Sequence, residues 1–136
     1  MDIEDALAVL AEQHRAVLST LRADGTPQLT PVLVTADGDG RAVISTREGS
    51  AKVANLRRDP RAWLCALPPQ FFGRWVQVAG DVEIVELPEA LPLLEDYYRR
   101  ISGEHPDWDA YRESMRSENR VLVRVLPTQA VAPAGS

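Results

Sequence analysis

The fold is decided by residues 16–35, which read Ala16-Val17-Leu18-Ser19-Thr20-Leu21-Arg22-Ala23-Asp24-Gly25-Thr26-Pro27-Gln28-Leu29-Thr30-Pro31-Val32-Leu33-Val34-Thr35. Two runs rich in apolar and β-branched residues, 16–21 and 28–35, flank the dipeptide Asp24-Gly25. Asp-Gly between such runs is a strong hairpin signal, because both residues tolerate the backbone angles of tight turns. We therefore predict an antiparallel hairpin made of strands 16–21 and 28–35.

The same alternation of apolar runs and short turns continues along the chain. Strands are also predicted at 41–46, 62–67, 75–85 and 120–126, with Gly80 as a candidate bulge or bend. Helical spacing of apolar residues predicts helices at 2–13, 88–101 and 107–117, and a short one around Lys52. We expect a mainly β (α+β) protein: a six-stranded antiparallel barrel, closed or half-closed, with short flanking helices, because closure removes exposed sheet edges.

Composition narrows the class of protein. With 136 residues, 45% of them hydrophobic, we expect one domain over residues 1–136, with a loose tail from about residue 128. The formal net charge of −5 argues against a nucleic-acid partner. No stretch is apolar enough to span a membrane, and the acidic start is unlike a signal peptide, so we expect a cytoplasmic protein.

The motifs of several enzyme classes are missing from the sequence. It has no Gly-x-Gly-x-x-Gly turn and no Walker loop, and its single cysteine and two histidines lack the spacing of a metal site. No serine sits in a nucleophile elbow, so no catalytic residue can be named from the sequence. If the protein is an enzyme, a bound cofactor would have to supply the chemistry.

Lys52 is the only lysine of the chain, and it lies at the start of the short predicted helix. Ser50 is a plausible N-cap for that helix, whose first N–H groups lack intrahelical partners and attract anions. One interpretation is therefore a phosphate site made by the helix start and the lysine ammonium. The other is an ordinary solvated lysine on a connecting helix.

Three stretches together resemble the split β-barrel flavin/deazaflavin oxidoreductases, which are related to pyridoxamine 5′-phosphate oxidase. The middle stretch is shared widely in that family, and the last is more similar to the branch that uses the deazaflavin coenzyme F420, as found in actinobacteria. The stretches are residues 21–32, LRADGTPQLTPV; residues 52–61, KVANLRRDPR; and residues 101–112, ISGEHPDWDAYR.

The resemblance implies a homodimer with two cofactor sites at the subunit interface. It implies that the cofactor phosphate is held by Ser45, Thr46, Lys52 and Asn55, with Ser50 at the helix start. It places the deazaflavin ring along the second and third strands, near the backbone of Pro31 and Val32. Trp75, or the loop 71–74, would cover the site from one subunit.

The chain departs from the family at position 50. Relatives often carry an arginine two residues before the lysine, where this chain has Ser50, and Arg47 is the candidate replacement. The function implied is hydride transfer between reduced F420 and a planar conjugated acceptor such as a quinone, an enone or a tetrapyrrole. The alternatives are an FMN-binding oxidoreductase of the same fold, or a non-catalytic F420- or tetrapyrrole-binding protein.

Overall fold

The computed structural model describes residues 1–133 of the chain. Its strands are β1 (Arg15–Leu21), β2 (Pro27–Leu33), β3 (Thr35–Ala36), β4 (Ala42–Arg47), β5 (Arg61–Ala66), β6 (Val76–Val85) and β7 (Arg120–Val131). Its helices are α1 (Ile3–Leu10), α2 (Ala51–Arg58), α3 (Ala90–Ser102) and α4 (Trp108–Ser117). The strands form one antiparallel sheet in the order β2-β1-β5-β6-β7-β4-β3.

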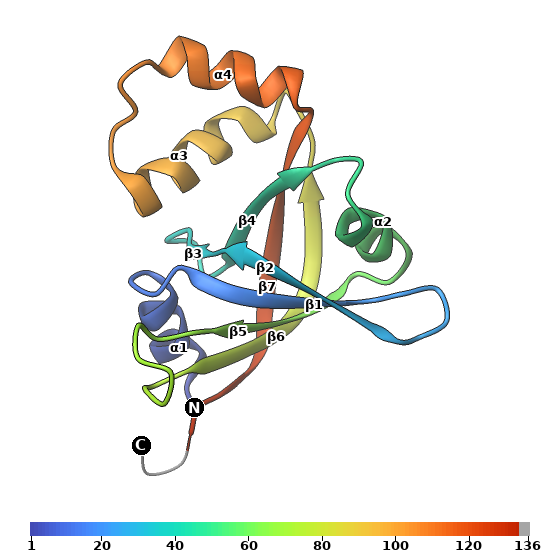
Figure 1. Cartoon of the computed structure of the whole chain (residues 1–136), viewed down its shortest axis with the longest axis vertical. Coiled ribbons are helices and arrows are strands. Elements are labelled where there is room, and N and C mark those ends of the chain that lie inside the picture. Colours follow the sequence, from blue (N-terminus) through green and yellow to red (C-terminus); the bar gives the residue numbers. More distant parts are fainter. Residues whose placement is uncertain (134–136) are drawn as a thin grey trace.

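The single sheet curls into a half-barrel, and the helices lie around its outside (Figure 1). The main core contains buried apolar side chains from β1, β4, β5, β6 and β7, among them Leu18, Ile44, Leu64, Val78 and Val123, and the partly buried Val32 of β2 packs against it. Helix α1 covers this core with two fully buried side chains, Ala6 and Leu10. Helices α3 and α4 lie side by side beyond the end of β4 and pack on a second, smaller core around Leu94 and Leu122.

The hairpin predicted from residues 16–35 is confirmed. Strands β1 and β2 pair antiparallel from Arg15–Leu33 to Leu21–Pro27. Gly25 has a φ of +85°, and the Asp24 carboxylate accepts hydrogen bonds from both the N–H and the hydroxyl of Thr26. The turn therefore uses the conformational freedom of glycine and the short acceptor of aspartate, as the sequence indicates.

Within residues 1–133 the sheet has seven strands, so the prediction of six was wrong. The run 28–35 does not stay one strand: β2 ends at Leu33, and Thr35 pairs with Val43 in β4 instead. Between them, the N–H of Val34 donates to the carbonyl oxygen of His14 at 2.8 Å, while its side chain is fully buried. The chain thus changes partner strand at Val34, which a continuous β-branched run cannot reveal.

The prediction of a loose tail from residue 128 was also wrong over residues 128–131. Strand β7 continues to Val131 and pairs with the start of β6, from Gln77 to Ala79. A register shift between Ala79 and Gly80 confirms the predicted bulge, and it lets β7 bend past Pro127 and resume pairing. The part of the tail prediction that covers residues 134–136 lies outside the described residues.

The ends of the first helix differ from the prediction over 2–13. Asp2 caps it by accepting a hydrogen bond from the N–H of Glu4, but the helix ends at Leu10. Within residues 1–133, no helix has the length and apolar character needed to cross a bilayer.

Candidate functional site

A cleft of about 450 Å³ opens where the sheet is split between β2 and β4. One wall is the end of β2, another is the end of β4, and the tyrosine-rich sides of α3 and α4 form a third. This volume is within the range of ordinary small-molecule sites. The cleft is lined by Pro31, Val32, Leu33, Ser45, Thr46, Lys52, Tyr97, Tyr98, Tyr111, Met115 and Arg120.

Lys52 reaches this cleft from the first turn of α2. Ser50 is the N-cap of that helix, as predicted, and its hydroxyl oxygen accepts a hydrogen bond from the N–H of Val53 at 3.4 Å. The hydroxyl of Thr46 in turn donates to the Ser50 oxygen at 3.3 Å. These two bonds fix the start of the helix against the end of β4, so the lysine is presented to the cleft from a rigid support.

The electrostatics of the cleft favour an anion. The pKa of Lys52 lies below its usual value of 10.5, first because burial removes water from the ammonium and second because Arg120 repels it. Among the described residues, the cleft lining contains both of these cations and no carboxylate. A partly buried ammonium without a counter-charge is costly, and an entering phosphate or carboxylate would remove that cost.

Tyrosines form the opposite wall and are themselves held in place. The hydroxyl of Tyr97 donates to the carbonyl oxygen of Leu33 at 2.9 Å, which ties α3 to the end of β2. The hydroxyl of Tyr111 donates to the carbonyl oxygen of Leu94 at 2.8 Å, and burial raises its pKa to about 12. The rings of Tyr98 and Tyr111 lie 5.1 Å apart. The wall is therefore a rigid aromatic surface suited to a flat ligand.

Five of the nine site residues predicted from the sequence line this one cleft: Pro31, Val32, Ser45, Thr46 and Lys52. They come from β2, β4 and α2, which lie apart in the sequence and meet at the split of the sheet. Ser50 stands behind them as the helix cap. The contact of each residue with a cofactor stays a prediction.

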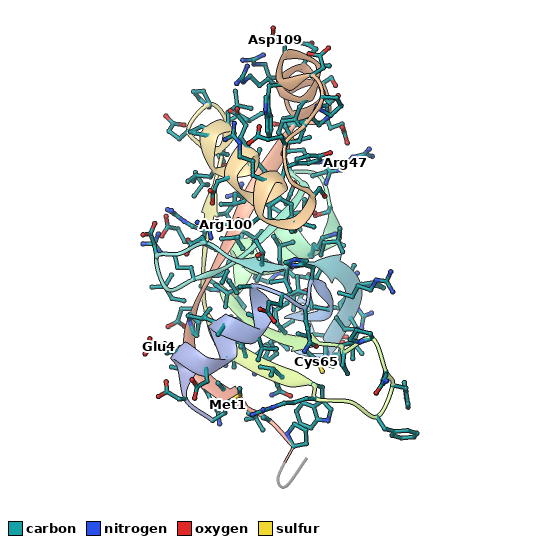
Figure 2. All side chains as sticks on the ribbon, turned by 90° about the vertical axis from the view of Figure 1, so that its left-hand side faces the viewer. Met1, Glu4, Arg47, Cys65, Arg100 and Asp109 are labelled. Atoms are coloured by element: carbon teal, nitrogen blue, oxygen red, sulfur yellow. The ribbon has the colours of Figure 1, made fainter. Side chains whose placement is uncertain are left out.

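The structure places the other three predicted residues outside the lining of the cleft. Arg47 is exposed, with 64% of its side chain accessible, and pairs with Glu118 at 3.1 Å. Figure 2 shows its side chain projecting outward from the molecule. Asn55, in α2, is buried, and Trp75 lines a separate hollow beside Phe71 and Phe72.

The sequence did not predict six residues of the lining: Leu33, Tyr97, Tyr98, Tyr111, Met115 and Arg120. Helical periodicity predicted the two helices that carry four of these side chains, and two of the four, Tyr111 and Met115, are largely buried. Arg120 begins a strand with no recognisable motif around it. An aromatic pair within a helix that is otherwise amphipathic, Tyr97-Tyr98, was the one available signal.

The half-barrel, split at a cleft that contains two cations, marks the chain as a small split β-barrel domain, and comparison with known proteins identifies the family. The model of the pyridoxamine 5′-phosphate oxidase family matches residues 3–132. The chain belongs to this family, as the resemblance of its three sequence stretches predicted.

The relatives include named enzymes. An F420H(2)-dependent biliverdin reductase from Mycobacterium tuberculosis is 38% identical over 123 residues, which cover 90% of this chain and 81% of the relative. A solved structure described as F420 reductase is 25% identical, with a TM-score of 0.70, over 91% of this chain and 94% of the other. A conserved hypothetical protein from Mycobacterium tuberculosis is 28% identical, with a TM-score of 0.75, over 97% of this chain and 84% of the other.

Proposed function

We propose that the protein is an F420-dependent reductase that binds the deazaflavin coenzyme in the cleft between β2 and β4. The observation that carries the proposal is the position of Lys52, a partly buried cation facing a cleft without a carboxylate among its described lining residues. The mycobacterial relative that is 38% identical is named for the same coenzyme, which supports this assignment.

The residues of the cleft fit the two chemically different parts of such a coenzyme. Lys52, with the hydroxyls of Ser45 and Thr46 nearby, provides charge and hydrogen-bond donors for a phosphate. Pro31 and Val32 provide an apolar wall for a flat ring. A ligand that carries both parts would use the whole cleft rather than one end of it.

When bound, reduced F420 supplies the hydride, so the protein needs no nucleophile of its own. Lys52 and the polar end of the cleft anchor the ligand, and the tyrosine wall limits the access of water. Because Tyr97 and Tyr111 are fixed by hydrogen bonds to backbone carbonyls, the walls keep their positions without a ligand. Their contribution is to hold the reacting faces in one orientation.

The acceptor class that we propose is planar and conjugated: a quinone, an enone or a tetrapyrrole. The side of the cleft formed by Tyr98, Tyr111 and Met115 offers two aromatic rings and a thioether, which are suited to contact with such a molecule. The relative named biliverdin reductase makes a linear tetrapyrrole the first acceptor to test.

We also propose that the protein is a homodimer with its two sites at the subunit interface. The surface beside the cleft is apolar: Leu33 and Leu67 are 48% and 45% exposed and share a hollow of about 480 Å³. Phe71 and Phe72, 86% and 93% exposed, project from the loop that follows β5. Exposed apolar surface of this extent supports a protein partner, and a second copy of the chain would cover both apolar hollows.

The expected cytoplasmic location stays a prediction.

The test is a direct comparison of cofactors, followed by turnover. The purified protein is titrated with F420 and with FMN, and binding is followed by fluorescence quenching. Saturable binding of F420, and oxidation of reduced F420 on addition of biliverdin, a quinone or an enone, are expected. Preferential binding of FMN would replace the coenzyme in the proposal, and tight F420 binding without turnover on any acceptor would make the protein a carrier.

A further inference from the structure

Arg120 is the second cation of the cleft, and it comes from a different part of the chain than Lys52. It is the first residue of β7, and its side chain is 27% exposed. It lines the cleft together with Lys52, and its charge is near enough to contribute to the lowered pKa of the lysine. Two cations directed into one hollow repel each other unless an anion lies between them.

Glu118 holds the Arg120 side chain in place from outside the cleft lining. One oxygen of its carboxylate accepts hydrogen bonds from Nε of Arg120 at 3.3 Å and from Nη2 at 3.0 Å. The same oxygen accepts a bond from Nη2 of Arg47 at 3.1 Å. A guanidinium has five N–H donors, so Arg120 keeps free donors after this pairing.

The backbone explains why these three side chains meet. Arg47 and Arg120 lie directly opposite each other in the β4–β7 ladder. Asn119, at the turn from α4 into β7, has a φ of +48°, and its carbonyl oxygen accepts a bond from the N–H of Glu48. This turn brings Glu118 back beside the first residue of the strand. Arg47 and Arg120 thus share one carboxylate, but only Arg120 lines the cleft.

Resting on the proposed function, we propose that Arg120 is a direct ligand of the coenzyme phosphate, paired with Lys52, and that Glu118 is the residue that positions it. The planar fork of a guanidinium matches two phosphate oxygens at once, whereas an ammonium acts as a point charge. The two side chains approach the cleft from α2 and β7, so together they hold an anion from two elements. Arg47 pairs with the same carboxylate but does not line the cleft.

The experiment compares F420 with its phosphate-free deazaflavin chromophore as ligands in fluorescence titrations. Arg120→Gln is expected to weaken F420 binding about tenfold or more, since a charge-assisted bond to phosphate is lost. Binding of the phosphate-free chromophore should stay at the wild-type level. Arg47→Gln is the matched control, because it breaks a bond to the same carboxylate without removing a cleft cation.

Two further variants separate binding from folding. Arg120→Lys keeps the charge but not the fork, and an intermediate affinity for F420 is expected. Glu118→Gln should weaken F420 binding less than Arg120→Gln does, and again leave the phosphate-free chromophore unaffected. Thermal unfolding of each variant is recorded beside the titrations.

The results that overturn the inference are distinct from those that overturn the proposed function. Wild-type F420 affinity in Arg120→Gln, with affinity lost in Lys52→Ala, would remove Arg120 from the site and leave the function standing. Equal losses for F420 and the phosphate-free chromophore would make Arg120 a structural residue only. Absence of F420 binding by the wild-type protein would overturn both proposals.

Discussion

The side-chain amide of Asn55, in α2, donates a hydrogen bond to the hydroxyl oxygen of Thr20, in β1, at 3.1 Å. The same nitrogen donates to the side-chain oxygen of Gln28, in β2, at 3.0 Å. Asn55 is 5% exposed and Thr20 is 1% exposed, so this contact is shielded from water. Both N–H donors of the amide are used, and the bonds fix the helix that carries Lys52 onto the first hairpin.

This contact predicts a loss of stability when it is removed. Asn55→Ala should lower the free energy of unfolding by about 1–3 kcal/mol, because a buried polar partner is left unsatisfied. Urea denaturation of the ligand-free protein measures the change. A double-mutant cycle with Thr20→Val isolates the pair, and a coupling energy indistinguishable from zero would show that the bond contributes nothing.

Gly80 gives a second stability prediction. A Cβ atom at this position would lie 2.0 Å from the carbonyl oxygen of Leu126, which is shorter than any van der Waals contact allows. Gly80→Ala should therefore open the bulge between β6 and β7 and destabilise the fold by about 3 kcal/mol or more, at the upper end of overpacking costs. Gly49→Ala is the matched control, since a Cβ there meets nothing within 4 Å. Equal unfolding midpoints for the two variants would contradict the close approach.

The sequence alone predicts a structural feature well when the residues that form it are close together in the chain. The Asp24-Gly25 turn and the Ser50 cap were predictable, because the residues that make them are neighbours in the chain. The change of partner strand at Val34 was not, because it depends on pairing with β4. The continuation of β7 to Val131 was hidden by small residues that usually indicate a tail.

In the candidate site, too, residues close together in the sequence were predictable, and residues brought in by distant strand pairing were not. Lys52 was found from its place at a helix start, and Ser45 and Thr46 from their position relative to it. Arg47 was the expected second cation, because it is close in sequence and the family often has an arginine where this chain has Ser50. The structure instead puts Arg120 in the cleft, and only the antiparallel pairing of β4 with β7 brings it there.

The lowered pKa of Lys52 predicts how F420 affinity depends on pH. The anion binds to the protonated lysine, so affinity should fall as pH rises through a pKa that lies below 10.5. The free energy of unfolding of the free protein should rise with pH over the same range, because the unfolded chain keeps this proton to higher pH than the folded protein does. Binding constants measured over the alkaline range up to pH 10.5 give the profile.

Two variants test the origin of that profile. Lys52→Arg should remove the fall, since a guanidinium stays charged throughout the range. Arg120→Gln should move the fall to higher pH, because it removes the repulsion that contributes to the lowered pKa. A profile that is the same in all three proteins would mean that Lys52 does not titrate beside the bound anion.

The proposed dimer predicts a change in mass. Leu67 is 45% exposed and borders two apolar hollows, one with Leu33 and one with Phe71 and Phe72. Leu67→Asp places a charge in the centre of this surface and should convert dimers into monomers, as measured by light scattering during gel filtration. Leu126→Asp is the control, because Leu126 is 43% exposed but borders neither hollow. A wild-type protein that elutes as a monomer would refute the dimer.

The central claim is that Lys52 and the cleft above it bind the phosphate-bearing coenzyme, and one titration tests it most directly. Quenching of F420 fluorescence is measured with wild-type protein and with Lys52→Ala at neutral pH. We predict saturable binding by the wild type and an affinity at least about tenfold lower in the variant, the cost of one charge-assisted contact. Identical binding curves for the two proteins, or no binding by the wild type, would contradict the account.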